Sequence, residues 1–115
     1  MFITSLINHL EAQIIMSVVL PIDIDSVKGF LASDEGEALY QFALEASKLG
    51  PCLEVGSYCG KSTVYFGAAC KETNSTLYAL DHHRGSEEHQ LGEEYHDPEL
   101  YDAGIALMDS FHMFR

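Results

Sequence analysis

Residues 52–63 read CLEVGSYCGKST and combine the signals of a strand, a tight loop and the start of a helix. The run Cys52–Val55 is short and apolar, which is typical of a buried parallel strand. Gly56 and Gly60 bound the following loop, and a helical pattern then covers residues 61–71. Glycine lets a ligand approach the backbone closely and allows a positive φ. The segment therefore predicts a ligand-binding loop between a strand and a helix.

A second strand is predicted for residues 76–80, after a turn at Asn74 and Ser75. Strand, loop, helix and strand form a βαβ unit of a parallel sheet, so the expected fold class is α/β. Asp81 ends the second strand about 20 residues beyond Gly60, where a carboxylate can accept hydrogen bonds from both hydroxyls of a ribose. Loop and acid together indicate a nucleoside-type cofactor, although each alone is also typical of a plain turn.

The sequence ahead of this unit predicts helices. Apolar residues at spacings of three and four indicate an amphipathic helix or extension within residues 1–20, so that the main domain covers residues 21–115. A short helix is expected at residues 26–31, and a longer one from an N-cap at Ser33 to about Leu49. The buried stripe of the longer helix is predicted to comprise Ala38, Leu39, Phe42, Ala43, Ala46 and Leu49.

Residues 81–102 contain eight acidic residues, one arginine and four of the six histidines, without an apolar repeat. We therefore expect a long loop, with a helix resuming near Pro98 and a last helix over residues 105–115. Histidines among carboxylates can bind a divalent metal, but no pair here has the spacing of a helical ligand motif. A metal site is accordingly not expected.

Length and charge restrict the classes of function. The 115 residues form one domain at most, and 47% apolar with 21% charged residues is typical of a globular chain. Eighteen acidic against six basic residues give a net charge of -12, so neither nucleic acid nor an anionic membrane is an expected partner. Three cysteines without a CxxC pair, and no basic residue in the first twenty, indicate a cytoplasmic protein without a signal peptide.

The sequence Gly60-Lys61-Ser62 also ends a P-loop, so a nucleoside triphosphatase is a rival interpretation. A P-loop needs four residues between its glycines, however, and Gly56 and Gly60 enclose three. Glu54 adds a negative charge where a triphosphate needs donors, whereas an ammonium group would suit it. S-adenosylmethionine carries an ammonium and a sulfonium group, so charge favours this ligand over ATP. A non-catalytic ligand-binding or interaction module is the other interpretation left open.

The loop resembles the first motif of class I S-adenosylmethionine-dependent methyltransferases, in the form seen in catechol O-methyltransferase-like proteins. The matching positions are Glu54, Gly56, Tyr58, Gly60 and Ser62. The stretches DHHRGSEEHQ at 81–90 and EYHDP at 94–98 are similar to one bacterial subgroup of that superfamily. The resemblance covers roughly residues 25–115 and implies the N-terminal part of a Rossmann-like methyltransferase fold, inactive as this chain alone.

The resemblance also implies that S-adenosyl-L-methionine gives a methyl group to a small-molecule acceptor, which the sequence does not identify. By position, Glu54 and Gly56 would line the methionine moiety. Ser62 would reach its carboxylate, and Asp81 would hold the ribose. No catalytic residue is assigned, and two copies could pair as a homodimer to cover open apolar faces. Cys59 is expected to be inert, although its place near a helix start could also lower its pKa. The predicted cofactor site comprises Glu54, Gly56, Ser57, Tyr58, Gly60, Ser62, Asp81 and His82.

Overall fold

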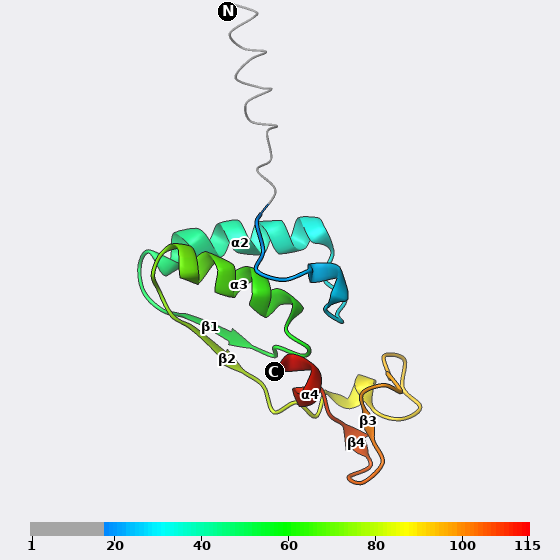
Figure 1. The fold of residues 1–115 in the computed structure, drawn as a ribbon. Coiled ribbons are helices and arrows are strands. Elements are labelled where there is room, and N and C mark those ends of the chain that lie inside the picture. Colours follow the sequence, from blue (N-terminus) through cyan, green and yellow to red (C-terminus); the bar gives the residue numbers. More distant parts are fainter. Residues whose placement is uncertain (1–17) are drawn as a thin grey trace, which may run out of the picture.

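The computed structural model describes residues 18–115, so the helix predicted within residues 1–20 lies largely outside the described range. The main part consists of two helices and two strands: α2 (Ser33–Ser47), β1 (Cys52–Val55), α3 (Lys61–Glu72) and β2 (Leu77–Leu80). Both helices lie on one face of the two-stranded sheet, and no described element covers the opposite face (Figure 1). No described helix is long and apolar enough to cross a bilayer.

The first two strands and α3 form the predicted βαβ unit. β1 and β2 pair in parallel, in the register that places Val55 opposite Leu80. The pairing continues one residue further, because the Gly56 N–H donates to the Leu80 carbonyl at 2.9 Å. Since the strands are parallel, the glycine loop and the segment that begins at Asp81 leave the sheet at the same edge. An open α/β sheet binds its ligands at that edge.

Helices α2 and α3 pack closely because small residues lie between them. Gly36 of α2 lies against the ring of Tyr65, and a Cβ built on Gly36 would overlap that ring. Near the other end of α2, the Thr73 hydroxyl donates to the Ser47 hydroxyl at 2.8 Å. The Tyr40 hydroxyl of α2 also donates to the Glu72 carboxylate of α3. The two helices therefore contact each other along their length.

The buried stripe predicted for α2 is largely wrong: Ala43 is buried and Leu39 is half-buried, whereas Ala38 and Ala46 are exposed. Phe42 is 75% exposed, and Leu49, which lies beyond the end of the helix, is 92% exposed. The helix is rotated so that its buried residues are Gly36, Ala43 and Ser47. A pattern of apolar side chains could not reveal this rotation, because the close contact depends on the missing side chain of Gly36.

The segment ahead of α2 is irregular rather than helical. A 3-10 turn, η1 (Ile24–Ser26), forms where the Asp23 carboxylate accepts a backbone N–H two residues further on, at 3.1 Å. The short helix predicted at residues 26–31 is wrong, since the chain after η1 consists of bends. The N-cap of α2 is Ala32, one residue before the predicted cap.

The chain after β2 forms short elements that differ from those the sequence predicts. Its elements are η2 (Glu87–His89), the antiparallel strands β3 (Tyr101–Asp102) and β4 (Leu107–Met108), and the helix α4 (Phe111–Phe114). The helix expected near Pro98 is not formed, and most of the predicted last helix is replaced by β4 and turns. Figure 1 shows this hairpin beyond the sheet, on the side where the strands end.

A small buried cluster attaches the hairpin to the βαβ unit. Leu100 and Met108 pack against Cys59 of the glycine loop, and Tyr58 adds its ring to the cluster. The Asp109 N–H donates to the Leu100 carbonyl at 2.7 Å. These contacts join residues that are distant in the sequence, so local periodicity could not predict them.

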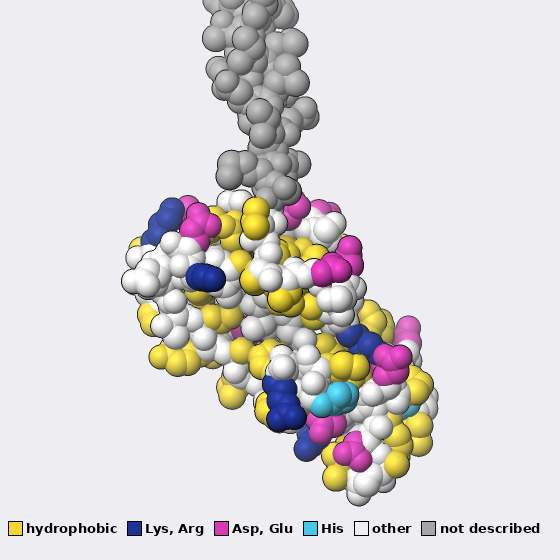
Figure 2. Space-filling model, in the orientation of Figure 1, with side chains coloured by type: hydrophobic (Ala, Val, Ile, Leu, Met, Phe, Trp, Pro, Cys, Tyr) yellow, Lys and Arg dark blue, Asp and Glu magenta, His cyan; other side chains and the backbone are white. Residues whose placement is uncertain are grey.

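Four apolar side chains remain exposed on the uncovered face of the sheet: Leu53, Val55, Tyr78 and Leu80. In β1 they alternate with Cys52 and Glu54, which are less exposed. Figure 2 shows hydrophobic side chains at the surface along the part of the molecule where Figure 1 places β1 and β2. The prediction of a buried strand at Cys52–Val55 is therefore wrong for Leu53 and Val55, because both helices lie on the same face.

Replacing Gly36 with alanine should destabilise the fold, because the added methyl group would overlap the Tyr65 ring. We expect the free energy of unfolding to fall by about 1–3 kcal/mol, the usual cost of overpacking. Gly50→Ala is the matched control, since a Cβ at Gly50 meets nothing within 4 Å. Urea titrations followed by circular dichroism measure both changes. Equal stability of the two variants would contradict the helix packing described here.

Candidate functional site

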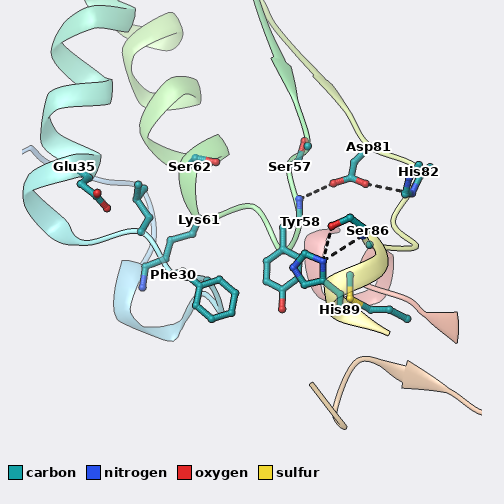
Figure 3. Close-up of a pocket in the computed structure, with 15 residues that line it drawn as sticks. Phe30, Glu35, Ser57, Tyr58, Lys61, Ser62, Asp81, His82, Ser86 and His89 are labelled. Carbon is teal, nitrogen blue, oxygen red and sulfur yellow. Dashed lines mark hydrogen bonds and ion pairs between the residues drawn. The ribbon is translucent and has the colours of Figure 1, made fainter. Parts of the chain in front are cut away.

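A cavity of about 590 Å³ opens at the carboxyl ends of β1 and β2 (Figure 3). Its walls come from the segment ahead of α2, the glycine loop, the start of α3, the end of β2 and the turn around η2. The residues that line it are Gly29, Phe30, Leu31, Glu35, Gly56, Ser57, Tyr58, Lys61, Ser62, Asp81, His82, Gly85, Ser86, His89 and Met108. The cavity thus lies where an open α/β sheet typically binds its ligand.

Asp81 connects the end of β2 to the glycine loop. Its carboxylate accepts the backbone N–H of Tyr58 at 2.7 Å and that of His83 at 2.6 Å. Burial by itself would raise the pKa of Asp81, but the two N–H donors and the nearby His83 and His82 side chains lower this pKa below its usual value. Asp81 is therefore ionised at neutral pH and presents a fixed negative charge at the cavity wall (Figure 3).

The glycine loop has a tight conformation that includes one unusual residue. Gly56 and Gly60 have φ of 87° and 95°, which confirms the need for glycine at these two positions. Tyr58 also has a positive φ, of 53°, which is uncommon for a bulky side chain. The hydrogen bond from the Tyr58 N–H holds this conformation, and its ring lies 6.1 Å from the Phe30 ring and 5.8 Å from the His89 ring.

Two hydroxyl groups of the loop are buried, those of Ser57 and Tyr58. Neither has a hydrogen-bond partner among the described residues. Ser57 is 2% exposed. Burial raises the pKa of Tyr58 to about 12, so its hydroxyl stays protonated and is able to donate. A buried polar atom without a partner is costly. The two hydroxyls are therefore suited to a partner that comes from a ligand or from water.

Glu54 does not line the cavity. It is buried in β1, and its carboxylate accepts hydrogen bonds from the hydroxyls of Ser62 and Thr63 at the start of α3. This contact fixes α3 to β1. Ser62 does line the cavity, but its hydroxyl proton is directed to Glu54. Ser62 can therefore accept a hydrogen bond from a ligand, but it does not donate one to a carboxylate in this arrangement.

Gly60 also lies away from the cavity wall. It is the N-cap of α3, and a Cβ built on it would lie 3.2 Å from the ring of Phe114. Of the eight residues in the predicted cofactor site, the structure brings six to the wall: Gly56, Ser57, Tyr58, Ser62, Asp81 and His82. Their contact with a cofactor stays a prediction.

Each of the four histidines within residues 81–102 makes its own contact, and that of His96 joins its Nδ1 to the His89 carbonyl at 3.2 Å. The exposed His82 accepts a backbone N–H at its Nδ1, at 3.0 Å. The Nδ1 of His83 lies 2.9 Å from the Ser110 hydroxyl, and that of His89 lies 3.0 Å from the Ser86 hydroxyl. In the part of the chain that the structure describes, no three His, Cys, Asp or Glu side chains are grouped to hold a metal ion.

Sequence reasoning missed the wall formed by residues 29–31, ahead of α2. Lys28 anchors this segment, because its ammonium pairs with Asp97 at 2.6 Å and also with Glu99. Hydrogen bonds to these two carboxylates raise the pKa of Lys28. Lys61 on the wall was missed as well, although it lies inside the glycine motif. The sequence signal for the contacts of Lys28 was weak: Lys28 is the only lysine or arginine ahead of α2, and residues 81–102 are acidic.

Residues 53–111 match the family described as Methyltransferase domain. The match covers about half of the chain and runs from β1 to the start of α4, so it includes the glycine loop, Asp81 and the hairpin. The chain therefore belongs to the methyltransferase domain family. This membership confirms the resemblance found in the loop, and it identifies the βαβ unit as part of a Rossmann-like methyltransferase fold.

Cys59 should be unreactive in the folded chain. The start of α3 does not lower its pKa; burial raises the pKa of this thiol to about 11. Cys59 is also only 4% exposed, whereas Cys52 is half-buried. At about pH 8, iodoacetamide should therefore modify Cys52 well before Cys59, because alkylation needs both a thiolate and access. Peptide mass spectrometry measures the two rates, with the urea-unfolded chain as control. Equal rates for Cys59 in the folded and unfolded chain would contradict its burial.

Proposed function

We propose that this chain binds S-adenosyl-L-methionine in the cavity and supplies the cofactor site for methyl transfer to a small-molecule acceptor. Family membership supports methyl transfer in general. The observation that carries the cofactor proposal is the position of Asp81, which ends β2, faces the cavity and is tied to the glycine loop by the Tyr58 N–H. One carboxylate can thus shape the loop and bind the ligand.

The polar groups on the wall suit this cofactor. Each oxygen of Asp81 accepts one backbone N–H and keeps a further acceptor position, so both hydroxyls of a ribose find an acceptor. The lowered pKa keeps Asp81 in its accepting form. The Ser57 hydroxyl, which has no hydrogen-bond partner within residues 18–115, lies in the same wall. The cavity of about 590 Å³ falls in the usual range for small-molecule sites, about 300–1,000 Å³.

S-adenosylmethionine, when bound, supplies an electrophilic methyl group on a positively charged sulfur. The task of the chain is then to orient the reactants, since positioning accounts for much of the rate of a bimolecular displacement. The rings of Phe30, Tyr58 and His89 lie together on one side of the cavity and offer ring surfaces to a ligand. The net charge of -12 favours a cationic ligand over a phosphate.

The hydrogen bonds of the glycine loop support a P-loop function less well. The N–H groups of Gly56, Tyr58 and Gly60 all donate to acceptors within the chain. A P-loop needs such N–H groups free, because they cradle the phosphates. Together with the short spacing between the glycines, this pairing favours the methyltransferase cofactor over ATP.

Isothermal titration calorimetry of the full chain measures its affinity for each candidate cofactor. We expect S-adenosylmethionine and S-adenosylhomocysteine to bind, and ATP with magnesium to bind at least about tenfold more weakly, a difference of about 1.4 kcal/mol. The reason is that the loop N–H groups are occupied and the wall is acidic. A parallel titration with a chelator should give the same affinity for the two sulfur ligands. Tighter binding of ATP would contradict the proposal.

Asp81→Ala should weaken the binding of S-adenosylhomocysteine by about 1.5–3 kcal/mol, the usual cost of losing hydrogen bonds to a charged group. Asp102→Ala is the matched control, because it removes the same charge from an exposed residue that does not line the cavity. Asp81→Asn, which keeps one acceptor oxygen, should give a smaller loss. Circular dichroism shows whether each variant is folded. An unchanged dissociation constant in folded Asp81→Ala would remove this residue from the site.

A further inference from the structure

Lys61 is the one lysine or arginine on the cavity wall among the described residues. Its aliphatic chain packs against Gly29, where a built Cβ would lie 3.1 Å from the Lys61 Cβ. Within residues 18–115 its ammonium forms no ion pair, although the chain carries eighteen acidic residues. Among the described residues, the Lys61 ammonium is therefore available to pair with an anionic group of a ligand in the cavity.

The surroundings of Lys61 favour an anion. α3 begins at Lys61, and Gly60 before it offers no side chain to cap the first N–H groups of the helix. These N–H groups attract negative charge. Ser57, which is 2% exposed and has an unpaired hydroxyl among the described residues, lines the same cavity. The Ser62 hydroxyl, in contrast, donates to Glu54. Lys61 is thus the side chain at the start of α3 that is able to neutralise an anionic ligand group.

The two sides of the cavity carry different chemistry. Figure 3 shows Lys61 and Glu35 on one side, with Asp81 on the opposite side. Glu35 is held in place because its carboxylate accepts the Ala32 N–H at 3.0 Å. The side opposite Asp81 therefore offers one positive and one negative side chain. An α-amino acid group, with its carboxylate and its ammonium, carries the complementary pair of charges.

We infer that Lys61 binds the carboxylate of an α-amino acid group on the ligand. The inference rests on the proposed function, in which this group is the methionine end of the cofactor. The family resemblance implied that Ser62 contacts the carboxylate of the methionine moiety. We assign this contact to Lys61 instead. The ligand class is then a nucleoside that carries an amino acid, with its ribose at Asp81 and its carboxylate at Lys61.

Two ligands that differ only at this end test the inference. S-adenosylhomocysteine carries the amino acid group, whereas 5′-methylthioadenosine keeps the adenine, ribose and thioether but lacks it. Lys61→Met keeps the aliphatic contact with Gly29 and removes the charge. By calorimetry on the full chain, this variant should lose at least about fivefold in affinity for S-adenosylhomocysteine and change by less than about twofold for 5′-methylthioadenosine.

Lys71→Met is the matched control, because it removes the same charge from an exposed residue at the other end of α3. It should leave both affinities unchanged, and Lys61→Arg should keep most of the affinity for S-adenosylhomocysteine. An equal loss for both ligands would mean a purely structural role and overturn the inference. An unchanged affinity for S-adenosylhomocysteine would also overturn it, since the anion would then belong to another molecule such as the acceptor.

The result for the unmodified chain separates this inference from the proposed function. If the unmodified chain binds neither ligand, the proposed cofactor site itself is wrong. If it binds both and the Lys61 variants behave as the Lys71 control does, only the role of Lys61 is wrong. Thermal unfolding is recorded for each variant, and Lys61→Gln replaces Lys61→Met if the latter does not unfold cooperatively.

Discussion

The hydrogen bond from the Tyr58 N–H to the Asp81 carboxylate determines the shape of the site. It joins the loop after β1 to the end of β2, so the two strand ends form one wall of a cavity. It also holds Tyr58 at a positive φ, which places its ring between those of Phe30 and His89. Hydrogen bonds to an ionised carboxylate are stronger than neutral ones, and the low pKa of Asp81 keeps it ionised. The part of the wall at the ends of β1 and β2 depends on this contact.

The carboxylate of Glu54 also connects two elements of the βαβ unit, in this case β1 and α3. Glu54 accepts hydrogen bonds from Ser62 and Thr63, which fixes the first turn of α3 to β1 and sets where that helix starts. Gly36 then allows α2 to approach α3 closely, so both helices cover the same face of the sheet. In so acidic a chain, these two carboxylates are stabilised by hydroxyl and backbone donors within the chain. Lys61, in contrast, forms no ion pair within residues 18–115.

The sequence predicted the parts of the fold that are consecutive in the chain. Strand, glycine loop, helix, strand and Asp81 follow one another, and each has a local signal, so the βαβ unit and six of the fifteen residues of the cavity wall were predictable. The orientation of Glu54 was not, because a strand residue can face either the helix or the ligand, and the motif alone does not say which. The contact of Leu100 with Cys59 and the pairing of Lys28 with Asp97 depend on folding across long sequence distances. Residue patterns carry no information about such contacts.

The most direct measurement is a nuclear magnetic resonance titration of the full chain with S-adenosylhomocysteine, following the backbone amide signals. The amides of Tyr58 and His83, which donate to Asp81, should shift together with those of Gly56 and follow one saturation curve. Amides of the hairpin that do not line the cavity, such as that of Asp102, should stay unchanged. Shifts confined to the hairpin, or a Tyr58 amide that does not respond while others saturate, would contradict the account.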